Sequence, residues 1–157
     1  MTVERARTYL AQFGLDGNVM EFDQSSATVE LAAAAVGCEP ERIVKTLSFE
    51  VGDRVALIMC AGDARIANPK FKAQFQTKPR MLAADQVEAR IGHGIGGVCP
   101  FGVEDGCDVY LDESLRRFDV VYPGCGSASS SVRLTLEELE RATPGSQWID
   151  VCKLPEA

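Results

Sequence analysis

The sequence lacks any long hydrophobic run. No stretch of its 157 residues approaches the ~20 consecutive apolar residues that a membrane-spanning helix needs. The first residues, Met1 to Arg5, lack the basic region and apolar core of a signal peptide. We therefore expect no membrane association and a cytoplasmic location. The length favours a single domain, residues 1–157.

Histidine is also scarce, because His93 is the only one in the chain. The six cysteines are irregularly spaced and form no Cys-x-x-Cys pair, which indicates reduced thiols rather than disulfides. No metal site is expected, since zinc needs clustered histidine and cysteine ligands. The sequence has no P-loop and no Gly-x-Ser-x-Gly motif, and we expect no cofactor.

Positive charge is limited, and the net charge is −7. An acidic protein repels the phosphate backbone, which excludes the wrapping of a long nucleic acid. The basic residues are nevertheless uneven, and six of them lie within one third of the chain, at Arg65, Lys70, Lys72, Lys78, Arg80 and Arg90. Two interpretations remain open: a local patch for the tip of a nucleic acid, and ordinary solvated charges.

Hydrophobic periodicity predicts helices and strands in mixed order. The expected helices span 3–13, 28–37, 68–76, 85–92 and 135–142, with a short helix after Asp112. Their expected ends are marked by local signals: Thr28 as a cap and Gly37 as a stop, Asn68 as a cap, and capping-box patterns at Asp85–Glu88 and Thr135–Glu138. The expected strands span 18–23, 43–51, 55–60, 80–83, 109–111, 118–122, 131–134 and 148–151. Residues 43–60 read as an antiparallel hairpin turning at Gly52 and Asp53. This order predicts an α+β domain with a mixed sheet rather than a doubly wound parallel one.

Lys45 is the most informative residue, because it interrupts the apolar face of its strand. That face otherwise carries Ile43, Leu47, Phe49 and Val51. Burying an unpaired lysine is costly, so its position suggests a functional charge. The alternative is a lysine whose ammonium group reaches sideways to water.

A glycine-rich loop from Gly92 to Gly102 is the second unusual segment. It matches G-x-G-x-x-G but follows a predicted helix instead of a strand, which argues against a dinucleotide site. Its backbone N–H groups can serve a carbonyl oxygen, a phosphate or a base edge. The alternative is a tight crossing where only glycine fits. Cys99 could act as a nucleophile beside His93, although a small wall residue is the simpler interpretation.

Taken in order, these features resemble the YbaK-type prolyl-tRNA editing domain family of free-standing aminoacyl-tRNA deacylases. The resemblance runs from about residue 3 to 150. It is carried, in order, by Thr28-Val29-Glu30-x-Ala32-Ala33 with Gly37, Ile43-Val44-Lys45-Thr46-Leu47, Gly96-Gly97-Val98-Cys99-Pro100-Phe101-Gly102, a glycine-rich turn, and Leu134-Thr135-x-x-Glu138-Leu139. It implies a partly barrel-like mixed sheet with flanking helices. It also implies hydrolysis of the ester that joins a wrong amino acid to tRNA, notably tRNA for proline.

The same resemblance implies the site residues. Lys45 is expected to be the essential lysine, with the substrate contacted by Gly96, Gly97, Val98, Cys99, Pro100, Phe101, Gly102, Gly124 and Ser131. Cysteine-specific members carry a Gly-Lys-Arg-Gly-type run followed by an aspartate. Here small residues occupy 124–130 and Ser131 falls near the acidic position, which weakens the expectation of cysteine specificity. Such a pocket suits alanine, serine, threonine or another small residue.

The expected partner is the CCA end of aminoacyl-tRNA, with prolyl-tRNA synthetase as a transient partner and the protein itself a monomer. The alternative from another class is a non-catalytic module that binds a tRNA 3′ end or a nucleotide in the same pocket. A thiol-dependent enzyme using Cys99 is a weaker third hypothesis.

Overall fold

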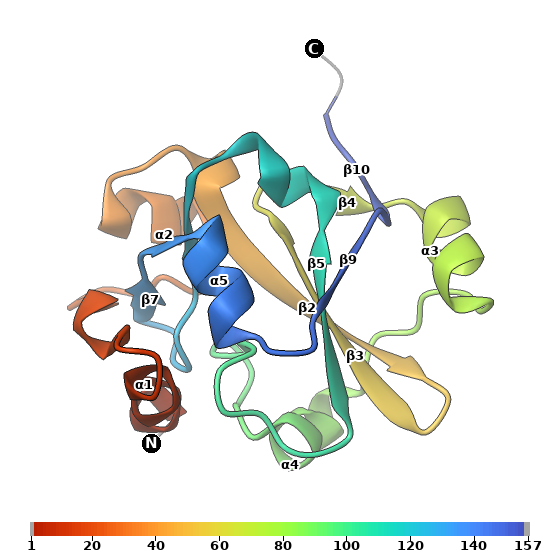
Figure 1. The fold of residues 1–157 in the computed structure, drawn as a ribbon, viewed down its shortest axis with the longest axis horizontal. Coiled ribbons are helices and arrows are strands. Elements are labelled where there is room, and N and C mark those ends of the chain that lie inside the picture. The colour runs from red at the N-terminus through yellow and green to blue at the C-terminus, as the bar shows by residue number, and fades with distance from the viewer. Residues whose placement is uncertain (1, 156–157) are drawn as a thin grey trace.

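A mixed six-stranded sheet organises the protein, and helices surround it (Figure 1). The structure is a computed structural model that describes residues 2–155. Its α-helices are α1 (Thr2–Ala11), α2 (Val29–Val36), α3 (Asn68–Phe75), α4 (Val87–Ile91) and α5 (Leu136–Ala142). Its strands are β1 (Val19–Glu21), β2 (Ile43–Val51), β3 (Arg54–Ala61), β4 (Arg65–Ile66), β5 (Cys107–Asp112), β6 (Val120–Pro123), β7 (Ser130–Val132), β8 (Leu134–Thr135), β9 (Gln147–Ile149) and β10 (Cys152–Lys153). Short 3-10 helices cover Asp16–Asn18, Pro40–Arg42, Ala84–Gln86 and Glu113–Arg117.

The strand order of the sheet is β8-β6-β2-β3-β5-β9. The β2–β3 and β6–β8 pairs are antiparallel, whereas β2–β6, β3–β5 and β5–β9 are parallel. Two small antiparallel pairs, β1–β7 and β4–β10, lie outside it. The sheet curls as a half-barrel, which confirms the predicted α+β class with a mixed, partly barrel-like sheet (Figure 1).

The predicted hairpin is confirmed, and it is the centre of the fold. Strand β3 is buried along its whole length except at Arg54, since it lies between β2 and β5. Gly52 makes the turn with a positive φ of 63°, a conformation that glycine adopts without steric cost. In the β2–β3 register, Lys45 lies opposite Cys60.

Local capping signals set several helix ends as the sequence predicts. The hydroxyl of Thr28 accepts the Leu31 N–H at 3.1 Å, and Gly37 ends α2 in the left-handed conformation with φ 86°. Thr135 and Glu138 form the expected reciprocal capping box of α5. These caps are short-range interactions, and so they are readable from sequence.

Three local predictions are wrong. Residues 80–83 form no strand. The segment makes two backbone hydrogen bonds with β2, in which the Glu50 N–H donates to the Arg80 carbonyl and the Leu82 N–H donates to the Ser48 carbonyl. Asp85 makes no capping box, because residues 84–86 form a 3-10 turn with no side-chain cap. Asn68 is the first residue of α3 rather than its cap, which is Ala67.

The main core fills the space between the sheet and helices α1, α3 and α5, with Phe71, Phe101, Leu111 and Leu139 fully buried. Within residues 2–155, none of the helices combines the length and apolar character needed to cross a bilayer.

Candidate functional site

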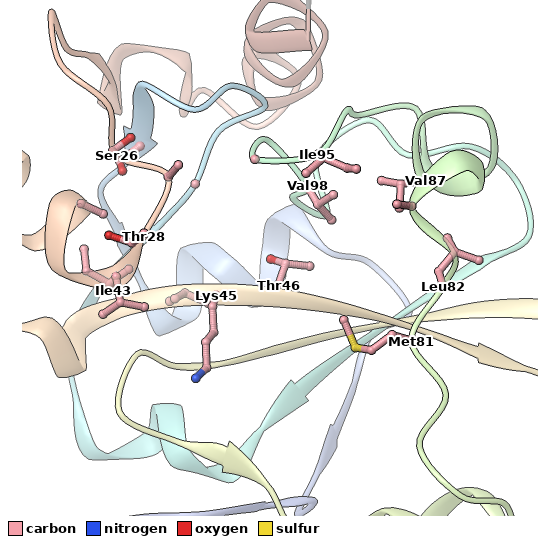
Figure 2. A pocket seen from close by; sticks show the side chains of 18 residues that line it. Ser26, Thr28, Ile43, Lys45, Thr46, Met81, Leu82, Val87, Ile95 and Val98 are labelled. Atoms are coloured by element: carbon pink, nitrogen blue, oxygen red, sulfur yellow. The ribbon is translucent and has the colours of Figure 1, made fainter.

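Lys45 is the third residue of β2 and is half-buried. Its side chain leaves the apolar face of the strand and runs to the turn after β3, where Nζ lies 3.5 Å from the carbonyl oxygen of Gly62. Figure 2 shows the ammonium group on the side of β2 away from Ile95 and Val98. The lysine therefore has a buried stem and a charged end at the mouth of a cavity, which is the geometry of a partly desolvated cation.

The turn that receives Lys45 is tightly packed. A Cβ atom on Gly62 would lie 2.2 Å from the carbonyl oxygen of Pro40 and 2.7 Å from Cγ1 of Val29, so only glycine fits there. The Ala64 N–H closes the turn on the Ala61 carbonyl at 3.0 Å. The carbonyl that faces Lys45 is thus held by backbone packing rather than by a mobile loop.

Asp63 follows in the same turn and is held by an arginine. The Arg117 guanidinium donates to both carboxylate oxygens of Asp63, at 2.6 and 3.0 Å. Arg117 is itself fixed by a 3.0 Å bond to the Ser114 carbonyl and by stacking 4.8 Å from the Phe118 ring centre. The bonds from Arg117, with the nearby charge of Lys45, lower the pKa of Asp63 below its ordinary value, so it is an anion at neutral pH.

Two cavities share Lys45. The first, which we call the apolar cavity, has a volume of about 380 Å³ and lies against β2 and the start of α2 (Figure 2). Its walls are Ser26, Ala27, Thr28, Val29, Ala32, residues 43–46, Met81, Leu82, Ala84, Val87, Ile95, Gly96, Val98, Gly124 and Ser131. Lys45 is the sole titratable side chain on these walls.

The second, which we call the polar cavity, has a volume of about 640 Å³ and lies on the other side of Lys45. Its walls are Val29, Glu30, Lys45, Gly62, Asp63, Ala64, Arg65, Lys153, Leu154 and Pro155. It therefore combines three basic and two acidic side chains, whereas the apolar cavity has one charge. Lys45 therefore lies between a largely apolar cavity and a charged one.

The structure brings half of the predicted site residues together. Lys45, Gly96, Val98, Gly124 and Ser131 all border the apolar cavity although they come from three separate segments. Gly124 and Ser131 face each other across an isolated β-bridge, which closes the small-residue turn, residues 124–131.

The other predicted residues lie behind the cavity wall or away from it. A Cβ on Gly97 would lie 2.5 Å from the Gly126 carbonyl oxygen, so the glycine loop crosses the small-residue turn at this point. Cys99 and Phe101 are fully buried in the core. Pro100 borders a different cavity, and Gly102, with φ 75°, packs on Arg5, whose Nε donates to its carbonyl.

The thiol-dependent hypothesis has little support in the geometry. Cys99 is fully buried, and burial raises the pKa of its thiol far above the ordinary value, so it stays protonated. Its neighbour His93 is also buried, with Nε2 2.6 Å from the Phe101 carbonyl oxygen, so this nitrogen is the donor. Burial lowers the pKa of His93, so its ring is neutral and serves to hold the glycine loop.

Sequence reasoning missed the turn after β3, and it missed that the start of α2 lines the cavity. Gly62, Asp63 and Arg117 come together across 54 residues, and no pattern in a single sequence connects them. Ser26 and Thr28 bring the start of α2 to the apolar cavity. Within residues 2–155, Ser26 Oγ is a buried atom without a hydrogen-bond partner, which makes it a free polar group on an otherwise largely apolar wall.

Comparisons with known proteins agree with this arrangement. The sequence profile described as "Aminoacyl-tRNA editing domain" matches residues 23–142. An uncharacterised protein of Bacillus subtilis (strain 168), YwhH, is 48% identical over 154 residues, which is 98% of both chains. EbsC of Enterococcus faecalis (strain ATCC 700802 / V583), provisionally named a Cys-tRNA(Pro)/Cys-tRNA(Cys) deacylase, is 26% identical over 127 residues, covering 79% of this chain and 77% of its own.

A solved structure shows the same fold. It is described as a provisional trans-editing enzyme for prolyl tRNA synthetase and superposes with a TM-score of 0.88 and 30% identity over 97% of both chains. The resemblance that the Lys45 strand and the glycine loop indicate is confirmed. The chain belongs to the aminoacyl-tRNA editing domain family.

Proposed function

We propose that the protein hydrolyses the ester of mischarged aminoacyl-tRNA in trans, with a small amino acid on tRNA(Pro) as its substrate and Lys45 as the catalytic residue. One observation carries the proposal: Lys45 stands where the apolar cavity and the polar cavity meet. An aminoacyl-tRNA end has the matching halves, since an amino acid side chain is joined by an ester to a polar ribose and its phosphates. Membership of the editing family supports the assignment.

In this arrangement the amino acid enters the apolar cavity and the ester lies over β2 at Lys45. The Gly97 N–H is already bonded to the Gly94 carbonyl at 2.9 Å. The N–H groups of Gly96 and Val98 meet no acceptor among residues 2–155, so they can bond the oxygen that becomes negative during ester hydrolysis. Lys45 holds the ribose or phosphate oxygens on its own side of β2, and its positive charge acts on the ester from across the strand.

The proton transfer falls to the substrate or to water. No carboxylate or imidazole lies on the walls of the apolar cavity, and so no side chain there can act as a general base. The ribose hydroxyl or the α-amine of the aminoacyl group is close to its own ester and can activate the attacking water. The protein then contributes orientation and charge stabilisation.

The walls favour a small amino acid. Ser131 replaces the acidic residue that we expect in cysteine-specific relatives, and the unpaired hydroxyl of Ser26 offers a hydrogen bond to the amine or a side-chain hydroxyl. Discrimination by one methylene or hydroxyl group amounts to about 1–3 kcal/mol. Alanine, serine and threonine are therefore the first candidates, ahead of cysteine.

The test is a deacylation panel. Transcripts of tRNA(Pro) charged separately with Ala, Ser, Thr, Cys and Pro are incubated with the protein, and the remaining ester is measured over time. The proposal expects hydrolysis of one or a few of the small mischarged species and little of Pro-tRNA(Pro). Binding of the CCA end without hydrolysis of any species would instead support the non-catalytic module.

We also propose the oligomeric state, location and partner with which the protein acts. Residues 1–157 act as one editing domain and as a monomer, in the cytoplasm where tRNA is charged, and the acidic protein contacts only the CCA end. Prolyl-tRNA synthetase then supplies the remaining tRNA affinity through a transient complex. A deacylation rate that is unchanged when the synthetase is titrated in would remove this partner.

A further inference from the structure

The small β4–β10 pair places two positive charges side by side. In its antiparallel register Lys153 lies directly opposite Arg65, and both side chains are exposed. Directly opposed residues of an antiparallel pair share one face, about 5 Å apart at Cβ, and like charges in this position destabilise the pair. Within residues 2–155 neither side chain forms an ion pair, whereas nearby Lys70 is bonded to Asp150 at 2.9 Å.

The same two residues line the polar cavity together with Lys45. The cavity also has two acidic side chains, but Asp63 is already bonded twice by Arg117, and Glu30 is exposed at the start of α2. The other residues of the pair, Ile66 and Cys152, pack towards the core, so the charged face of β4–β10 is the one that opens on the cavity. Three cations from three strands therefore converge on one cavity.

Resting on the proposed function, we propose that the polar cavity binds the backbone phosphates of the single-stranded 3′ end of tRNA, with Arg65 and Lys153 as the phosphate-binding pair. The terminal ribose is at Lys45, and the strand leaves along the face of β4–β10. The repulsion between Arg65 and Lys153 is then relieved when a phosphate binds between their side chains. The cavity volume of about 640 Å³ is in the range of small-ligand sites.

The binding test needs no ester. A short fluorescent RNA ending in CCA is titrated with the wild-type protein, with Arg65→Gln/Lys153→Gln, and with Arg133→Gln, an exposed arginine that lines a different cavity. We expect the double variant to bind at least tenfold more weakly and Arg133→Gln to bind like the wild type. The slope of log affinity against log salt should fall by about 1.4 in the double variant, since each single-strand phosphate contact contributes about 0.7.

A second variant separates binding from folding. Arg65→Glu replaces the repulsion by an attractive cross-strand pair with Lys153, so its melting temperature should be higher than that of the wild type while its RNA affinity falls. Loss of affinity together with a gain of stability cannot come from misfolding.

Several results would overturn the inference: equal affinity and salt slope for wild type and double variant, no saturable binding of the RNA to the wild type, or displacement of the RNA by AMP at the same affinity, which would assign the cavity to a free nucleotide. These results are independent of hydrolysis. A protein that binds the RNA through this pair but cleaves no ester removes the proposed deacylase function alone.

Discussion

The ammonium group of Lys45 lies 3.5 Å from the carbonyl oxygen of Gly62. Gly62 can occupy this position only because it has no side chain, since Pro40 and Val29 leave no space for a Cβ atom. The orientation of the proposed catalytic lysine thus depends on a backbone turn that contributes no reactive group. The same turn carries Asp63, whose carboxylate is held in turn by the Arg117 guanidinium.

Gly62→Ala should therefore damage the site and the fold together. The added methyl group would lie 2.2 Å from a backbone oxygen, and relieving this overlap must move the turn, at a cost of about 1–3 kcal/mol in the free energy of unfolding. Chemical denaturation measures the cost. Gly17→Ala is the matched control, because a Cβ atom there meets nothing within 4 Å. Equal stability of the two variants would show that the turn is not constrained.

Asp63→Asn should weaken the charge arrangement around Lys45 while keeping the shape of the side chain. Asparagine has an NH2 donor in place of one carboxylate oxygen, so the turn loses the bidentate ion pair with the Arg117 guanidinium and the lysine loses a nearby negative charge. We expect deacylation to slow by about fivefold to tenfold, equivalent to about 1 kcal/mol. Asp53→Asn, in the exposed turn between β2 and β3, is the control. A rate equal to that of the control would exclude a positioning role for Asp63.

Gly124→Ala should change selectivity without harming the fold. A Cβ atom at Gly124 has no neighbour within 4 Å, and the residue lines the apolar cavity, so the methyl group should narrow the space for the amino acid. The ratio of rates for threonine and alanine esters should fall by about fivefold or more, as expected for one methyl group. An unchanged ratio across the deacylation panel would place the amino acid elsewhere.

His93 should titrate below its ordinary value of about 6.5, because burial disfavours the charged ring. As the single histidine of the chain, it gives one unambiguous NMR titration curve. Below about pH 6.5 the unfolded chain binds a proton that the folded protein does not, so the free energy of unfolding should fall as pH falls through this range. A histidine pKa at or above 6.5 would contradict the buried, neutral ring.

Particular residues show how far the sequence predicts this structure. Thr28, Gly37 and the Thr135–Glu138 capping box act within a few residues, and each is predicted correctly. The two-residue strands β4 and β10 are not, because so short a segment has no period and exists only through its distant partner. The failure at 80–83 has the same origin, since a brief contact with β2 decides the local conformation.

The candidate site, too, is only partly predictable from the sequence. Lys45 is identifiable because it breaks an alternating pattern, and the glycine loop because its composition is unusual. Three other features of the site are tertiary contacts: Gly97 against Gly126, the packing around Gly62, and the ion pair of Arg117 with Asp63. Neither the alternation of residue types nor the composition of the sequence predicts such contacts. Sequence reasoning thus locates the reactive charge but not the residues that hold it.

The most direct test compares Lys45→Ala with Lys72→Ala, an exposed lysine on α3 that borders neither cavity. Single-turnover deacylation is measured at saturating protein on the best substrate of the panel, with circular dichroism to verify folding. The account predicts that Lys45→Ala loses at least a hundredfold in rate, about 2.7 kcal/mol of transition-state stabilisation, while Lys72→Ala matches the wild type. Hydrolysis by folded Lys45→Ala at the wild-type rate would contradict the central claim.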